Sequence, residues 1–185
     1  FSMPKQLVYT RSIVNPVGAV KVSGKVGAFN VAYLGAVDEV NAGTSNPMVN
    51  LLRVKRDMGQ SSTIGAVYTD RTERGIDFNR VFGADAQLVL GGRYRINLLA
   101  AGSADGASGA ATDWGSMVTA SVSRASRKVS MSASFEDVDK DFRAGSGFIR
   151  RTGITQLQAR TGYTYRGKRG AFVESLSSSV DRKSV

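Results

Sequence analysis

The side chains able to do chemistry in this chain are carboxylates, serines and lysines, because its 185 residues include neither histidine nor cysteine. Thiol catalysis, disulfides, histidine metal ligands and histidine bases are therefore excluded. Glu136 and Asp137 are adjacent, so in a strand they point to opposite faces and do not form a catalytic pair. The glycine-rich stretch 102–109 lacks the lysine and the helix of a phosphate-binding loop. We expect no catalytic residues, no cofactor and no enzymatic activity.

Two other clusters offer ligand chemistry. Asp137, Asp139 and Asp141 have alternate spacing and oxygen atoms of the kind that calcium prefers. A solvated acidic loop is the simpler interpretation, so no metal is expected. Arg150 and Arg151 could grip acidic sugars or lipopolysaccharide phosphates through bidentate contacts. Alternatively, these arginines pair with the aspartates and only hold the loop in place.

Eight further charged residues occupy alternate positions within apolar segments, and this spacing is typical of strands with two unlike faces. In hydrocarbon each charge would cost about 2–4 kcal/mol near the midplane of a bilayer, so we expect all eight to face a wet lumen. The net charge of +10 makes an anion-selective pathway the sharper alternative to a plain water-filled wall. The expected lumen-lining residues are Lys21, Lys25, Arg53, Lys55, Asp85, Arg95, Glu136 and Arg160.

The same alternation predicts about ten strands, and a composition with 21 glycines and only 3 prolines favours strands joined by turns. No stretch approaches the roughly 20 consecutive apolar residues of a membrane helix. The segment from Val49 to Leu52 breaks the alternation and predicts a bulge. The expected strands cover 18–26, 29–37, 49–57, 62–69, 82–90, 94–100, 114–123, 129–136, 156–165 and, least regularly, 170–178.

Short and long connections alternate between these strands. In an up-and-down meander alternate connections lie at the same end, so this order predicts the short periplasmic turns and long extracellular loops of an outer-membrane barrel. Greek-key connections of a sandwich do not place short and long connections at opposite ends in this regular order. Short turns are expected near Gly27, near Gly59, at Gly91-Gly92, near Ser126 and at Gly167–Gly170, and long loops at Asp38–Pro47, Asp70–Asn79, Ser103–Asp113 and Asp137–Gly153.

The predicted fold is all-β, an antiparallel up-and-down transmembrane β-barrel with about ten strands here, as part of a larger barrel. One barrel segment covers residues 1–185, with 1–17 as an entering loop or partial strand and 18–178 as the strand meander. The first residues contain no secretion signal and the last ones no closing strand. We therefore expect a fragment of a longer chain.

Four segments, in order, resemble a C-terminal domain of unknown function found in large bacterial envelope proteins, where it follows a carbohydrate-binding module of the family-nine type. The resemblance implies a membrane β-barrel, a Gram-negative outer-membrane location and an upstream sugar-binding domain, but no settled activity. The segments are Val22–Val31, Arg53–Asp57, Asn79–Asp85 and Ser146–Arg151, the last of these following Asp141-Phe142.

The expected function is therefore a structural or transport barrel, porin-like or serving as an anchor for a carbohydrate-binding module. Its expected partners are outer-membrane lipid and lipopolysaccharide, glycans through the upstream domain, and other envelope proteins. The alternative is a soluble β-sandwich or barrel that binds glycans. A nucleic-acid-binding β protein would interleave cations and aromatics on one face. Here they fall on opposite faces, so no nucleic acid is expected.

Overall fold

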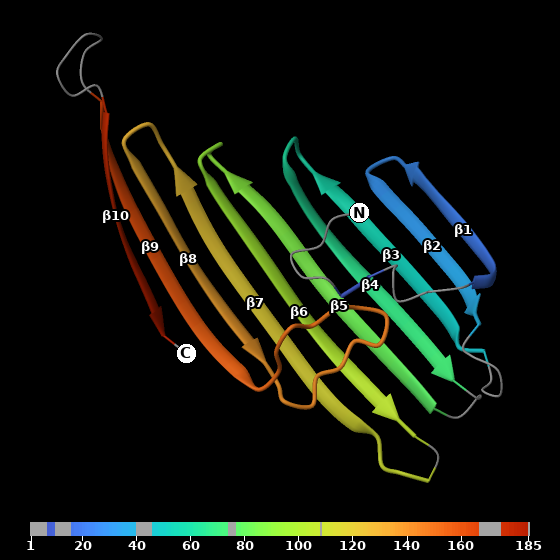
Figure 1. Cartoon of the computed structure of the whole chain (residues 1–185). Coiled ribbons are helices and arrows are strands. Elements are labelled where there is room, and N and C mark those ends of the chain that lie inside the picture. Colours follow the sequence, from blue (N-terminus) through green and yellow to red (C-terminus); the bar gives the residue numbers. More distant parts are fainter. Residues whose placement is uncertain are drawn as a thin grey trace.

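The computed structural model describes residues 7–9, 16–39, 46–73, 77–107, 109–166 and 175–184. These residues form one antiparallel sheet in which each strand pairs with the next along the chain (Figure 1). The all-β up-and-down meander predicted from the sequence is thus confirmed. The strands are β1 (Pro16–Val26), β2 (Phe29–Asp38), β3 (Met48–Met58), β4 (Ser62–Glu73), β5 (Asp77–Leu90), β6 (Tyr94–Gly106), β7 (Asp113–Ala125), β8 (Val129–Val138), β9 (Ile154–Arg166) and β10 (Ser175–Ser184).

The connections alternate between two ends of the sheet (Figure 1). We call them the turn end, which holds the connections 27–28, 59–61, 91–93 and 126–128, and the loop end, which holds 39–47, 74–76, 107–112 and 139–153. Positive φ angles at Gly27, Gly59, Gly91 and Gly92 close three of the turns. Left-handed backbone of this kind is open to glycine without steric cost, which explains the glycines at these positions.

The strands are longer than the apolar alternation predicted. The expected loop Asp70–Asn79 is reduced to residues 74–76, and the loop Ser103–Asp113 to residues 107–112. Backbone pairing continues beyond the apolar residues, where Arg80 Nε of β5 lies 3.2 Å from Asp70 Oδ1 of β4. The predicted strict alternation of short and long connections is therefore wrong at 74–76.

Two details of the strand prediction are also wrong. Pairing is regular from Val49 to Leu52, and the register shift of the sheet falls between Pro16 and Gly18. Apolar residues occupy both faces of β3 because Val49 is buried on one face while Leu52 is exposed on the other. The tenth strand covers 175–184 rather than 170–178, and residues 167–174 lie outside the described part of the chain.

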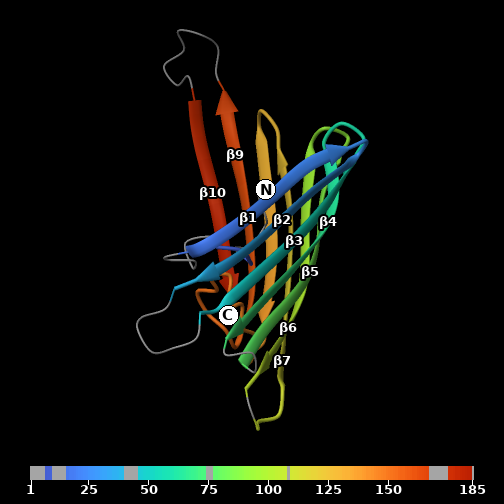
Figure 2. The ribbon, with the colours of Figure 1, turned by 90° about the vertical axis from the view of Figure 1, so that its right-hand side faces the viewer.

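The sheet is twisted and curved, so it has a concave and a convex side (Figures 1 and 2). The segment 139–153 between β8 and β9 turns back over β5–β8 on the concave side instead of extending away from the sheet (Figure 1). We call the face that it covers the inner face, which includes Arg53, Leu99 and Met117. The opposite face, which includes Leu98 and Val118, is the outer face.

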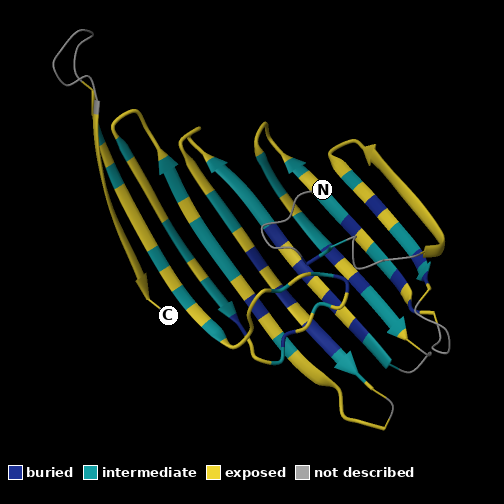
Figure 3. Ribbon diagram, in the orientation of Figure 1, coloured by how far each residue is buried: buried dark blue, intermediate teal, exposed yellow. Residues whose placement is uncertain are grey.

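The apolar core lies on the inner face, between the sheet and the chain segments above it. Phe142 of the 139–153 segment and Leu7 near the N-terminus are almost fully buried against strand residues. Figure 3 shows the buried positions gathered on the central strands near the loop end. The strand side of the core comprises Val67, Val81, Leu99, Ala101, Met117 and Val138.

β1 and β10 are the two edges of the described sheet, and they do not pair with one another. Each edge strand has a neighbour on one side only, so half of its backbone donors and acceptors face outward.

Replacing Gly91 with Val is expected to destabilise the fold by about 1–2 kcal/mol, because φ is 55° there and a Cβ clashes with the following carbonyl in left-handed backbone. Gly91→Asn should lose less, since asparagine tolerates this conformation. Urea unfolding midpoints of the two variants test this ordering. Equal midpoints for both variants and the parent would contradict the turn assignment.

Candidate functional site

The strand register places all eight charged residues singled out in the sequence on the inner face. They come from six different strands, which brings residues far apart in the sequence onto one surface. Their surroundings differ, however. Lys21, Lys25, Arg95 and Arg160 are exposed, Lys55 and Glu136 are half-buried, and Arg53 and Asp85 are buried.

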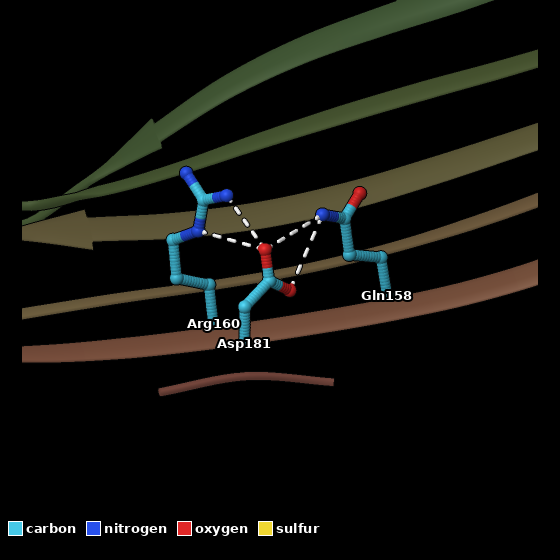
Figure 4. Close-up of polar contacts among 3 residues, drawn as sticks. All are labelled: Gln158, Arg160 and Asp181. Atoms are coloured by element: carbon cyan, nitrogen blue, oxygen red, sulfur yellow. Dashed lines mark hydrogen bonds and ion pairs between the residues drawn. The ribbon is translucent and has the colours of Figure 1, made fainter. Parts of the chain in front are cut away.

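Two exposed ion pairs lie towards the edges of this face. Lys25 Nζ of β1 is 2.8 Å from Asp57 Oδ2 of β3, and Asn30 of the intervening strand donates to the same carboxylate. On the far side of the sheet, Arg160 donates to Asp181 from Nη2 at 2.6 Å (Figure 4). Gln158 also donates to that carboxylate, so β9 and β10 are linked by side chains as well as backbone (Figure 4).

The third pair is buried and bidentate. Arg53 of β3 donates to both carboxylate oxygens of Asp85, with Nη2 to Oδ2 at 2.9 Å, and the two side chains are only 3% and 6% exposed. The guanidinium crosses β4 at Gly65, where a Cβ would lie 2.7 Å from Nη1. The expectation that Arg53 and Asp85 face water is therefore wrong. Each can be buried because the other neutralises it.

Three of the eight charged residues are cations without an ion-pair partner among the described residues. Within the described part of the chain, Lys21, Lys55 and Arg95 form no ion pair. Lys21 and Arg95 lie at exposed positions on different strands, with their charges open to solvent. Register also places Glu73, Asp77, Asp105 and Asp113 on the inner face, so its cations are offset by carboxylates nearer the loop end.

Two side chains and one backbone carbonyl, from three strands, hold the 139–153 segment on the inner face. The amide of Asn79 contacts it twice, donating to the Arg143 carbonyl at 3.2 Å and accepting from the Gly145 N–H at 2.7 Å. Ser103 Oγ accepts from the Arg143 N–H at 3.1 Å, and the Ser116 carbonyl accepts from the N–H of Asp139. These contacts satisfy backbone groups that would otherwise lack partners on the sheet.

The 139–153 segment lies close to the sheet at Gly115 of β7, which has no side chain. A Cβ on Gly115 would lie 2.3 Å from the backbone nitrogen of Phe142, so glycine is required there. The N–H of Tyr9 also donates to the Ser146 carbonyl at 2.7 Å, which ties the N-terminal segment to the same surface. The inner face is thus partly filled by the chain itself.

The arginines and aspartates of this segment do not form the predicted pairs. Arg150 and Arg151 are exposed, and among the described residues neither has an ion-pair partner. Asp137 instead accepts from Thr155, and Asp139 accepts from the N–H of Asp141. The predicted binding of acidic sugars or lipopolysaccharide phosphates by Arg150 and Arg151 stays a prediction.

The outer face is apolar across all ten strands and largely uncovered. Phe82 is 60% exposed, Trp114 73% and Met131 51%. Register assigns six charged residues to this face, and five of them lie towards the strand ends: Arg56, Asp70, Arg80, Arg124 and Asp137. The sixth, Arg182, lies on the edge strand β10.

Sequence reasoning did not find several residues that build the inner face. The sequence does not indicate Asp181, because the serine-rich start of β10 carries little apolar alternation. It does not indicate Asn79 either, because the alternation predicts a loop at that position. Gly65 and Gly115 were available as signals, since a glycine inside a strand often marks close approach of another group. That signal locates a contact but does not identify its partner.

Among the described residues, no cluster of carboxylates has the geometry to hold a metal ion, and no helix is long and apolar enough to span a membrane. Comparisons of the chain with protein-family models, curated proteins and solved structures found no match. The two faces of the sheet therefore carry the functional argument.

Gly115→Ala is expected to displace the 139–153 segment, because the new methyl group would collide with the backbone of Phe142. Gly102→Ala on β6 is the matched control, since its Cβ meets only one atom, at 4.0 Å. Trypsin cleavage after Arg143 and Arg150 should accelerate in the first variant alone. Unchanged cleavage of Gly115→Ala would show that the segment is not held as described.

Asp85→Asn is expected to destabilise the fold by roughly 3–5 kcal/mol, because it leaves the Arg53 charge buried without its partner. The double variant Arg53→Met with Asp85→Leu should recover much of this loss. Asp57→Asn is the control at an exposed pair, where little change is expected. Denaturation midpoints of these variants give the comparison, and an Asp85→Asn protein as stable as the parent would refute the buried pair.

Proposed function

We propose that this chain forms part of the wall of a bacterial outer-membrane β-barrel, with its outer face against lipid and its inner face towards the lumen. The observation that carries the proposal is the exposed apolar outer face, which extends over ten strands opposite a face of ion pairs. Monomeric soluble proteins rarely expose apolar patches beyond a few hundred Å². A contiguous apolar sheet face needs a partner, and lipid is a partner that can cover all of it.

The placement of charge supports the same partner. On the outer face, five of the six charges lie near strand ends, so the middle of the central strands is free of charge. A bilayer tolerates charge near its interfaces at about 0–1 kcal/mol but not at its midplane. The strands have 10–14 residues, enough for the roughly 9–11 needed to cross a bilayer, and five of them are longer than this. Their polar extensions at the loop end, with the Asp70–Arg80 pair, lie beyond the apolar band.

The open edges require further strands. In lipid, unpaired backbone groups cost several kcal/mol each, so β1 and β10 need partners before the sheet can lie in a membrane. Strands from the same polypeptide or from another chain would close the wall. Closure around the curved inner face gives a lumen that the 139–153 segment partly fills, consistent with a structural or restricted transport role.

The family resemblance supports a further part of this role, that of an anchor for a sugar-binding domain at the cell surface. Lipid, lipopolysaccharide and envelope proteins are the partners of such a barrel. The soluble glycan-binding alternative needs a second layer over the outer face, and the described residues form a single sheet. Detergent dependence separates the two functions.

The folded chain is expected to require detergent or vesicles and to show heat-modifiable migration on gels. Val118→Arg on the outer face should lower its stability in bilayers by about 2–4 kcal/mol. Thr119→Arg, the next residue of β7, should have much less effect, because it points to the inner face beside its register partner Glu136.

The emission of Trp114, the one tryptophan of the chain, reports transfer into an apolar phase. A monodisperse monomer in plain buffer whose Trp114 emission ignores detergent would refute the proposal. Equal effects of Val118→Arg and Thr119→Arg would refute the assignment of the two faces.

A further inference from the structure

We infer that the outer face binds anionic phospholipids at its turn end, with two arginines contacting headgroup phosphates and two apolar grooves receiving the acyl chains. This inference rests on the proposed function and deepens it by assigning a lipid class and a position. It starts from an unequal distribution of charge between the two ends of the sheet.

Four cations at the loop end have carboxylate partners, although Arg150, Arg151 and Lys183 do not, whereas at the turn end most cations lack such a partner among the described residues. Arg71, Arg80, Lys140 and Arg143 each lie within 4.0 Å of a carboxylate. At the turn end, among the residues that the structure describes, the one paired cation is Lys25. Among the described residues, eight cations there have no ion pair: Lys55, Arg56, Arg93, Arg95, Arg124, Arg127, Lys128 and Arg166.

Two of these unpaired cations lie on the outer face and are held by aromatic rings. The Arg56 guanidinium lies 5.4 Å from the ring centroid of Phe29, its register partner on β2. Arg124 lies at the same distance from Tyr94, its register partner on β6. Stacking fixes each guanidinium over an apolar surface and leaves its N–H donors free for an anion. Arg124 Nε is buried and has no hydrogen-bond partner among the described residues.

An apolar groove extends from each of these arginines along the outer face. The groove at Arg124 has a volume of about 440 Å³, and its lining on this face includes Tyr94, Val122, Met131 and a second arginine, Arg182 of β10. The groove at Arg56 has a volume of about 680 Å³, and its outer-face lining includes Phe29, Ile64, Ala84 and Leu98. Small side chains, Ala66, Ala84 and Ala100, lie side by side in its floor.

A guanidinium at the mouth of an apolar groove matches the chemistry of a phospholipid. Arginine binds phosphate oxygens bidentately, and a groove floored by small residues accommodates an acyl chain alongside the sheet. The surplus of cations at the same end favours a leaflet with net negative headgroups, since each basic residue near such a surface contributes to attraction. The ligand is therefore an anionic phospholipid of the leaflet at the turn end.

The test measures partition of the full chain, diluted from urea, into vesicles of phosphatidylcholine alone and of phosphatidylcholine mixed with phosphatidylglycerol. Flotation gives the bound fraction, and Trp114 emission confirms insertion. We expect stronger partition into the phosphatidylglycerol vesicles, weakened by salt. Arg56→Gln and Arg124→Gln should each reduce this preference by roughly five-fold.

Arg80→Gln is the matched control, because Arg80 also lies on the outer face over an aromatic ring, Phe78, but has Asp70 as its partner. It should retain the preference. If all three variants lost the preference for phosphatidylglycerol equally, net charge alone would explain the preference, and the inference would be overturned. Equal insertion into the two kinds of vesicle would overturn this inference but leave the proposed function standing. Failure to insert into any vesicle would overturn both the inference and the proposed function.

Discussion

Hydrogen bonding between neighbouring backbones is the constraint on which the rest of this structure depends. Each strand pairs with the next, so side chains are forced to alternate between two faces along every strand. With ten strands in register, that alternation produces one continuous apolar surface and one surface of ion pairs. The same constraint leaves outward-facing backbone groups on β1 and β10. The chemistry of both faces and the open edges of the described sheet thus have a common origin.

The inner face departs from the simple wet wall that alternation suggests. Part of it is dry, because Leu7 and Phe142 cover Val67, Leu99 and Met117. Glycines inside the strands make this possible, since Gly115 admits a backbone and Gly65 admits a guanidinium. The result is a sheet with apolar residues on both sides near the loop end and polar ones on the inner side elsewhere. In the proposed barrel, such a partly filled interior would resist free passage of solutes more than an empty one.

Much of the sheet could be predicted from the sequence, because a period of two is visible wherever one face is apolar. The eight charged residues share one face, as the alternation required. The strand ends could not be predicted, since pairing continues through polar residues such as Asp70 and Arg80. The buried pair of Arg53 and Asp85 also lies beyond local reasoning. It joins two strands separated by a third, and only the register shows that Gly65 lies between them.

The position of the 139–153 segment has a consequence for the order of folding. Strand pairing joins chain neighbours, whereas Asn79 contacts Gly145 across 66 positions and Ser103 contacts Arg143 across 40. Closing such long loops costs more chain entropy than forming a hairpin. The surface that binds the 139–153 segment also forms only once β5–β7 have paired. We therefore expect the apolar core to assemble after these strands. Hydrogen exchange at the amide of Gly145, protected later during refolding than the strand amides, would report this sequence of events.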